Sequence, residues 1–421
     1  MKFEEISEKE FEEFARNHEN KCYLQSTNVG ELRKRSGWDV YYVGLKENNT
    51  LVAATLLLAK KRYIKKEFYA MRGPLVDFRN EKVLRVLIDN LKDFVKKHGG
   101  YMLKIDPYIE GIRLDKDGKP TGEFDNSDIK EALKKLGFKE TIAKKMLDTN
   151  QAKFLYVIEL SDNMEDVMKD MESKTRQMIR KNEKSGIVIR KGDKKDIPLF
   201  TDIMEKTGER RGFVDRGEKF YTDMYECFEK DGMISLVFAE LDIDIAKENI
   251  SKEKEEIAKA QKEREINRKN GTLNEKKAAG KIKEEEAILN KIAKKEEELQ
   301  SLEKKYGKRV TIGAILYIIY ENEVASLFGG CYEEFRDYQP FYTIHYEMIK
   351  YAVENGYNRY NFYAIINKLD KNDDQYGIYE FKRGFGGHVM ELLGEYILPV
   401  DKVLFNSIAI ARKIKKILKR K

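Results

Sequence analysis

The chain has 421 residues, 41% of them apolar and 37% charged, which is enough for two or three domains with real cores and an unusually charged surface. The net charge of +7 is local, because residues 412–421 hold seven Lys/Arg and no acid; the remainder is balanced, which argues against a general nucleic-acid binder and against DNA as a partner. The three cysteines are far apart in sequence, so we expect no disulfides. There is no apolar run of roughly 18 residues and no signal-peptide core, so we expect a cytoplasmic protein without membrane spans.

The first third of the chain mixes helical and strand-like patterns, which predicts an α/β lobe. In order, we expect a helix at 8–18, a strand pair at 39–45 and 51–59, an amphipathic helix at 81–97 and a strand at 101–105. A polar, glycine-rich loop is predicted at 115–125 and a helix at 128–136. The first lobe is placed at residues 1–146.

A repeat relates the two halves of the chain. Gly73 is followed after 5, 6 and 26 residues by Phe78, Arg79 and Gly99, and Gly330 is followed at the same intervals by Phe335, Arg336 and Gly356. In both cases a helical pattern fills the gap and a strand-like pattern follows. We therefore expect a tandem duplication and a second α/β lobe, at 147–241 and 309–400, that contains basic helices within 164–185.

The segment 242–308 interrupts the second lobe. Ile243, Ile250 and Ile257 are seven residues apart, and after Asn270-Gly271 a second apolar stripe follows, formed by Ile282, Leu289, Ile292, Leu299 and Leu302. The remaining residues are mostly Lys and Glu, so we predict an antiparallel coiled-coil hairpin whose arms project about 37 Å. Such an arm could be a solvated spacer or a dimerisation rod, or it could contact a long, phosphate-rich partner such as tRNA.

Several kinds of catalysis are unsupported by the residues. The four histidines have no metal-ligand spacing, and there is no GxSxG motif, papain-like cysteine context or Walker A loop. We expect no metal and no cofactor. What remains is chemistry in which activated substrates arrive and the protein positions them.

Lys382 is the leading catalytic candidate. It lies between Phe381 and Phe385, and a partly shielded cation holds a carbonyl oxygen or a phosphate better than one in bulk water. A solvated turn is the alternative explanation of this Lys-Arg pair.

Two further basic sets lie beside glycines and aromatic residues, as phosphate-binding loops often do: Arg33-Lys34-Arg35, and Arg216 followed by Phe220 and Tyr221. Surface solvation is the alternative for both. Asp106 and Tyr108 directly follow a strand, where α/β folds often keep ligand contacts, although simple strand termination explains them equally well.

Together, five stretches resemble the FemABX family of peptidoglycan-bridge aminoacyltransferases: Arg72-Gly-Pro-Leu-Val-Asp77, Lys104-Ile-Asp-Pro-Tyr108, Gly212-Phe-Val-Asp-Arg216 through Tyr221, Arg359-Tyr-Asn-Phe-Tyr363, and Glu380-Phe-Lys-Arg-Gly-Phe385. The resemblance covers nearly the whole chain and implies two GNAT-like lobes. It also implies transfer of an amino acid from aminoacyl-tRNA to the stem-peptide amine of lipid II or a UDP-linked muropeptide.

The resemblance further implies roles for individual residues. One of Arg33, Lys34 and Arg35, together with Arg216, would hold precursor phosphates, and Phe220 or Tyr221 would line the same pocket. Phe381 and Lys382 match the family's Phe-Lys pair, with Lys382 binding the tRNA end and stabilising the transition state. Asp106 is a candidate proton acceptor, in competition with the substrate or water, and Tyr108 and Tyr363 are candidate substrate contacts.

The tail at 401–421 combines an apolar stripe with seven cations, which predicts either a helix on the inner membrane surface or packing against the lobe.

Two other functions remain open. An acyl-CoA-dependent N-acyltransferase needs a pyrophosphate loop that opens a helix, and the nearest string, at 383–388, departs at its last position and runs into a strand-like segment. A non-catalytic scaffold would use the coiled coil as its working part.

Overall fold

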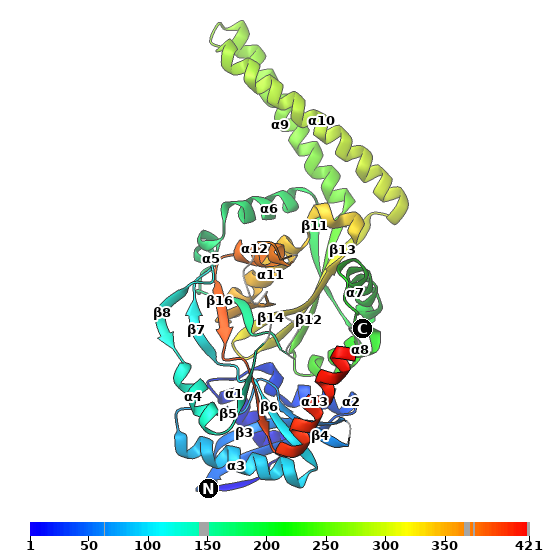
Figure 1. Ribbon diagram of the computed structural model, residues 1–421. Helices are drawn as coiled ribbons and strands as arrows, with labels where there is room; N and C mark the ends of the chain where they lie inside the picture. Colours follow the sequence, from blue (N-terminus) through cyan, green and yellow to red (C-terminus); the bar gives the residue numbers. More distant parts are fainter. Residues whose placement is uncertain (63, 143–150, 366–370, 374, 419–421) are drawn as a thin grey trace.

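The computed structural model describes every residue except 63, 143–150, 366–370, 374 and 419–421, and side chains in the last helix as far as Ala411. Two mixed β-sheets form the body, and a helical arm projects from it (Figure 1). The first sheet has the strand order β1 (Lys2–Glu5), β2 (Asp39–Glu47), β3 (Thr50–Arg62), β4 (Lys65–Ala70), β6 (Gly100–Ile105), β17 (Glu395–Pro399) and β9 (Lys139–Thr141), with β5 (Leu75–Val76) paired to β3.

The second sheet has the order β11 (Ile187–Gly192), β12 (Ile234–Asp242), β13 (Arg309–Tyr320), β14 (Glu323–Cys331), β15 (Arg359–Ala364), β10 (Phe154–Glu159), β16 (His388–Leu392), β7 (Glu110–Leu114) and β8 (Pro120–Asp125). The larger helices of the first half are α1 (Glu8–Asn17), α2 (Thr27–Arg35), α3 (Glu81–Lys97) and α4 (Ser127–Lys135). Those of the second half are α5 (Met164–Asp170), α6 (Ser173–Lys184), α7 (Ile197–Arg211), α8 (Glu218–Glu229), α11 (Phe341–Glu354) and α12 (Tyr376–Arg383).

The repeat seen in the sequence is a repeat of structure. In the first lobe β4 and β6 are parallel neighbours joined through α3, and in the second β14 and β15 are parallel neighbours joined through α11. The apolar face of α3, including Leu84, Leu87 and Leu91, is fully buried in the core of the first lobe. Both halves therefore use one strand–helix–strand unit, as the matched spacing predicts.

The sheets exchange strands, which the sequence did not indicate. The region predicted as a loop at 115–125 contains β8, which pairs with β7, and both strands extend the second sheet through β16. In return, β17 joins the first sheet between β6 and β9. The boundaries drawn at residues 146 and 400 therefore do not coincide with the division between the sheets. The prediction of a loop was wrong because β8 is mostly exposed and polar, so no apolar alternation marks it.

The segment 242–308 forms two long antiparallel helices, α9 (Ile243–Lys269) and α10 (Glu275–Tyr306), that stand out from the second lobe (Figure 1). Ile250 and Ile257 of α9 and Ile292 and Leu299 of α10 are buried along their contact, as the heptad spacing predicts. At the base, Asp242 pairs with Arg309 in the β12–β13 ladder, so the sheet continues beneath the insertion.

The last helix, α13 (Lys402–Leu418), packs by its first turns on the body of the first lobe. Leu404 and Ile408 are half-buried, whereas Val403 and Ile410 are 79% and 59% exposed. None of the described helices combines the length and apolarity needed to cross a membrane.

Candidate functional site

A pocket of about 190 Å³ lies between the two lobes. The first lobe contributes α2 and the short helical turn Tyr23–Gln25 that precedes it, and the second contributes α8 and the strands β14 and β15. The lining residues are Tyr23, Leu24, Val29, Leu32, Arg33, Gln151, Ala152, Arg216, Phe220, Met224, Phe228, Leu327, Phe328, Tyr363 and Ala364. Arg33, Arg216, Phe220 and Tyr363 were predicted from the sequence, and the structure brings all four together.

The divergence of two parallel strands opens this side of the pocket. β14 pairs with β13 along its whole length but with β15 only over Glu323–Ala325 and Arg359–Asn361, so β15 leaves β14 beyond Asn361. Tyr363 then turns the end of β15 with a φ of +65°, a strained conformation for a bulky residue. The side chain of Asn361 stabilises this turn by accepting a hydrogen bond of 2.7 Å from the backbone N–H of Tyr363.

Arg33 and Arg216 give the pocket its charge. Burial lowers the pKa of Arg33, and the positive charge of Arg216 lowers it further. The buried Nε of Arg33 has no hydrogen-bond partner among the described residues. Arg216 lies over the rings of Phe220 and Phe328, at 5.0 and 5.6 Å from their centroids. Two guanidinium groups that repel each other across a half-enclosed space suit an anion such as a phosphate.

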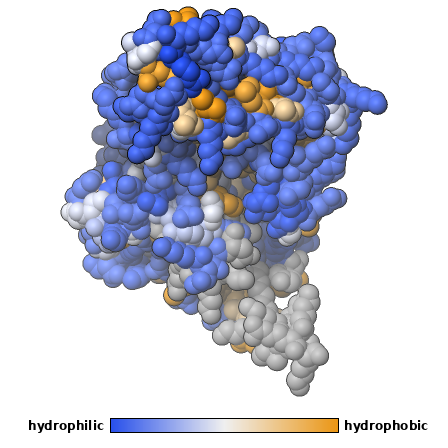
Figure 2. All heavy atoms as spheres, turned by 90° about the horizontal axis from the view of Figure 1, so that it is seen from above, coloured by the Kyte–Doolittle hydropathy of each residue, from blue (hydrophilic) through white to orange (hydrophobic). Residues whose placement is uncertain are grey.

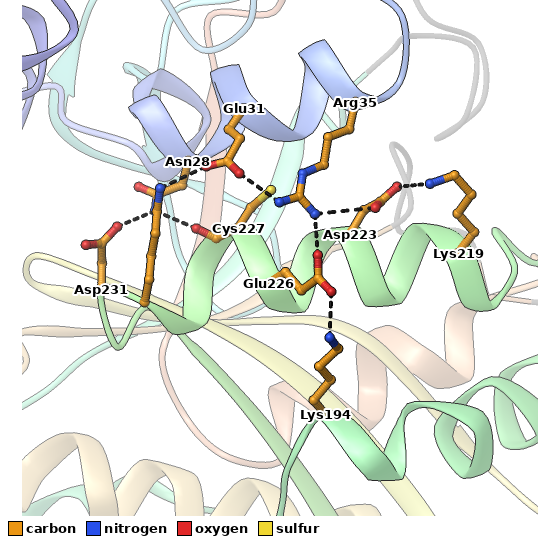
Figure 3. A network of polar contacts seen from close by, with 10 residues as sticks. Asn28, Glu31, Arg35, Lys194, Lys219, Asp223, Glu226, Cys227 and Asp231 are labelled. Carbon is orange, nitrogen blue, oxygen red and sulfur yellow. Dashed lines mark hydrogen bonds and ion pairs between the residues drawn. The ribbon is translucent and has the colours of Figure 1, made fainter.

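The neighbours of Arg33 do not share this role. Lys34 is exposed and pairs with Glu8 at 2.8 Å. Arg35 joins α2 to α8, because it pairs with Glu31 on its own helix and with Glu226 and Asp223 on α8 (Figure 3). Because α2 presents the three side chains in different directions, only Arg33 of the three lines the pocket, and which cation holds precursor phosphates stays a prediction.

Lys382 lies in the last turn of α12, not in the solvated turn that was its alternative. Its Nζ donates hydrogen bonds of 2.7 Å to the carbonyl oxygens of Phe362 and Ala364, at the end of β15. Desolvation lowers the pKa of Lys382 to about 7, while the two carbonyl acceptors favour the charged form. Lys382 does not line the pocket itself but is bonded to Ala364, which does.

An aromatic cluster surrounds this lysine. Phe381 contacts Tyr342 and Phe385, with centroids 4.9 and 5.3 Å apart. His345, which the sequence did not single out, is buried 5.5 Å from the ring of Phe381, and both burial and the charge of Lys382 lower its pKa. A lone histidine on an apolar helix face looks like an ordinary core residue, so only the fold reveals its place.

The remaining predicted residues lie in the structure around the pocket, not on its wall. Asp106 is 2% exposed; one carboxylate oxygen accepts the backbone N–H of Arg72 at 2.8 Å and the other lies 3.3 Å from its guanidinium. Burial raises the pKa of Asp106 to about 6, against the lowering effect of Arg72. These contacts give Asp106 a structural role, and its role as proton acceptor stays a prediction.

Tyr108 and Tyr221 also act as supports. Tyr108 donates a hydrogen bond of 2.7 Å to Glu323 of β14, which ties the two lobes together. Tyr221 is fully buried and donates to Asp215 at 2.5 Å, which fixes the loop that carries Arg216. Of the Phe220-Tyr221 pair, Phe220 is therefore the one that lines the pocket. In the described part of the chain, no group of His, Cys, Asp and Glu side chains is arranged to hold a metal ion.

Comparisons with known proteins agree with this architecture. The FemAB family model matches residues 6–413. The aminoacyltransferase FemA of Staphylococcus aureus (strain MRSA252) is 30% identical over 419 residues, which cover 99% of each chain. A crystal structure of FemX superposes with a TM-score of 0.77 and 28% identity, covering 97% of this chain and 100% of that one. A tandem GNAT protein from the clavulanic acid pathway shares the fold alone, with a TM-score of 0.50 and 9% identity over 95% of this chain and 98% of that one. The chain therefore belongs to the FemAB family.

Proposed function

We propose that this protein is an aminoacyltransferase that moves an amino acid from aminoacyl-tRNA to the stem-peptide amine of a peptidoglycan precursor and so builds the interpeptide bridge. The observation that carries the proposal is the joint placement of an anion-binding pocket and a shielded lysine. Arg33 and Arg216 face the pocket, and Lys382 is bonded to the carbonyl of Ala364 on the pocket wall. Membership of the FemAB family supports the same reaction.

The chemistry needs little more than positioning. The amine nitrogen of the acceptor attacks the ester carbonyl of the aminoacyl group, the new C–N bond forms, and the C–O bond to the tRNA ribose breaks. Negative charge develops on the carbonyl oxygen and then on the leaving ribose oxygen. A cation in a desolvated site stabilises such charge strongly, which is the role proposed for Lys382, with Phe381 beside it to contact the tRNA end.

The precursor would be held by its phosphates. Arg33 and Arg216 would bind them, while Phe220 and Tyr363 line the same pocket. Both the lipid-linked and the UDP-linked precursor carry a diphosphate, so the pocket suits either. The proton that leaves the amine goes to Asp106, to the substrate or to water. To accept this proton, Asp106 would have to give up its ion pair with Arg72.

A location in the cytoplasm at the inner membrane face is also proposed. Within the part of α13 whose side chains the structure describes, as far as Ala411, Val403 and Ile410 are exposed large apolar residues, while Leu404 is half-buried; in sequence, the cations of the tail follow at 412–421. Removal of residues 402–421 should reduce binding to vesicles that contain phosphatidylglycerol, measured by co-sedimentation. Unchanged co-sedimentation would leave packing against the first lobe as the only function of this helix.

An acyl-CoA-dependent reaction is the alternative. The string Arg383-Gly-Phe-Gly386-Gly-His388 follows α12 and leads directly into β16, so it does not open a helix as a pyrophosphate loop must.

A direct test incubates the protein with charged tRNAs and with lipid II or the UDP-linked pentapeptide, and weighs the product by mass spectrometry. A gain of one amino-acid residue supports the proposal and names the amino acid. No gain with any charged tRNA, together with label transferred from an acyl-CoA, would refute it.

The scaffold alternative is tested by shortening the arm. The ion pairs Lys254–Glu296 and Lys247–Glu303 belong to the half of the arm nearer the body and fix the pairing of α9 with α10. Replacement of residues 259–290 by a short helix-to-helix loop therefore keeps the base of the arm intact. Retained transfer activity would refute a scaffold whose working part is the arm.

A further inference from the structure

The helix α6 has an unusual distribution of charge. It carries Lys174, Arg176, Arg180, Lys181 and Lys184, and its single acidic residue is Glu183. At 100° per residue, the five cations fall within an arc of about 160° on the side opposite the buried Thr175 and Ile179. The exposed side of this helix is therefore predominantly positive.

These cations are not used in ion pairs. Among the described residues, no carboxylate lies within ion-pair distance of any of the five, although ion pairs are frequent elsewhere on the surface, as on the neighbouring α5, where Lys169 pairs with Asp166. Arg176 is the one with a clear structural task, since its Nη1 donates to the carbonyl oxygens of Met168 and Lys169 at the end of α5. The other four are exposed. The side of the molecule seen from above, from which the arm projects in Figure 1, is predominantly hydrophilic (Figure 2).

The position of α6 links the candidate catalytic lysine to the arm. At its N-terminal end, the N–H of Glu172 donates to the carbonyl oxygen of Gly384 at 2.8 Å, two residues after Lys382. At its C-terminal end, Asn249 near the base of α9 donates to the carbonyl oxygen of Lys184 at 3.2 Å. In Figure 1 the helix accordingly runs across the top of the second lobe, from α12 toward the base of the arm.

We infer that α6 is the surface on which the phosphate backbone of the aminoacyl-tRNA stem lies while the aminoacylated end of the tRNA reaches Lys382. This inference rests on the proposed function, and it assigns the partner-binding face that the proposal leaves open. A row of unpaired cations about 15 Å long suits a polyanion with regularly spaced charges. A small anion would need only one or two of these cations. A polybasic face can also bind an anionic lipid surface, and the test below separates that outcome from tRNA binding.

The test uses a triple variant, Arg180→Gln, Lys181→Gln and Lys184→Gln, which spares the structural Arg176. The matched control is Lys92→Gln, Lys96→Gln and Lys97→Gln on the exposed face of α3, at the opposite end of the molecule, with the same change of charge (Figure 1). Binding of bulk deacylated tRNA is measured by fluorescence anisotropy over a range of salt concentrations, and thermal unfolding verifies that both variants fold.

The α6 variant should bind tRNA roughly tenfold or more weakly, and the slope of log affinity against log salt should become shallower by about 2 to 3, since each phosphate contact contributes about 0.7 to 0.9. In transfer assays its KM for aminoacyl-tRNA should rise, while its KM for the peptidoglycan precursor stays unchanged. The α3 control should match the wild type in both measurements.

Equal tRNA affinity and salt slope in the two variants would overturn the inference. If instead the α6 variant loses only its binding to phosphatidylglycerol vesicles, this face contacts a lipid surface and the inference is wrong. Both failures leave the proposed function intact as long as the wild type transfers an amino acid. If the wild type transfers none from any charged tRNA, the proposed function itself has failed.

Discussion

The Nζ of Lys382 lies 2.7 Å from the carbonyl oxygen of Ala364, and Ala364 forms part of the pocket wall between the lobes. One hydrogen bond thus connects the candidate catalytic cation with the candidate binding pocket. The connection depends on the end of β15, where Tyr363 adopts a φ of +65° and the strand has already left β14.

The first prediction concerns the charge on Lys382. Lys382→Met should lower kcat by roughly a hundredfold or more, because removing one charged or hydrogen-bonding group that stabilises an oxyanion commonly costs that much. Since burial lowers the pKa of Lys382 to about 7, the wild-type rate should fall as the pH rises through that value. The rate of Lys382→Arg should not fall over this pH range, because the guanidinium stays charged. A pH-independent wild-type rate between 6 and 8.5 would contradict the role of Lys382 as a cation.

The second prediction separates Arg33 from its neighbour. Arg33→Ala or Arg216→Ala should raise the KM for the peptidoglycan precursor by about 10- to 150-fold, as expected when one charge-assisted contact worth about 1.5–3 kcal/mol is lost. Lys34→Ala is the control and should leave KM unchanged, because Lys34 pairs with Glu8 on the surface. Steady-state kinetics at saturating aminoacyl-tRNA would measure both, and an equal effect of Lys34→Ala would refute the assignment.

The third prediction distinguishes two roles of Asp106. If its role is structural, Asp106→Asn should lower the free energy of unfolding by about 3–5 kcal/mol, because Arg72 is left buried without a counter-charge. Denaturant unfolding would measure this loss. A variant of wild-type stability whose kcat is nevertheless abolished would show that Asp106 is the proton acceptor instead.

The fourth prediction concerns the ion pairs between α2 and α8. Hydrogen bonds from Lys194 and Arg35 lower the pKa of Glu226 to about 2, below its usual value near 4.3 (Figure 3). A carboxylate with a lowered pKa stabilises the fold above its unfolded pKa and loses this effect as the pH falls toward its folded pKa. Glu226→Gln should therefore lower Tm at pH 7, and the difference from the wild type should shrink between about pH 4.3 and 2.

The matched control for this prediction is Glu347→Gln, whose carboxyl has its pKa raised by burial. Its charged form opposes folding at pH 7, so Glu347→Gln should not lower Tm there, and any difference that arises from this charge should fall mainly as the pH drops toward about 4.3, above the range in which Glu226 loses its effect. A Glu226→Gln variant whose Tm equals that of the wild type at pH 7 and low salt would show that the α2–α8 ion pairs do not hold the lobes together.

Local sequence patterns determined the elements with strong periodicity. The helix α3 has the predicted bounds because an asparagine caps its start and Gly99 follows its end with a φ of +76°. The heptads of α9 and α10 predict the arm, and the matched spacing after Gly73 and Gly330 predicts the duplicated strand–helix–strand unit. These features depend on residues close in the chain, so the sequence alone is sufficient to indicate them.

What the sequence could not decide depends on residues brought together from distant parts of the chain. No local pattern shows that β7 and β8 extend the second sheet, or that β17 returns to the first. Likewise, the sequence does not distinguish the adjacent cations Arg33, Lys34 and Arg35. Only the direction in which α2 presents each side chain places Arg33 at the pocket and the other two in ion pairs. The lowered pKa of Lys382 arises from burial among residues of α11, α12 and β15 and is therefore a property of the tertiary structure alone.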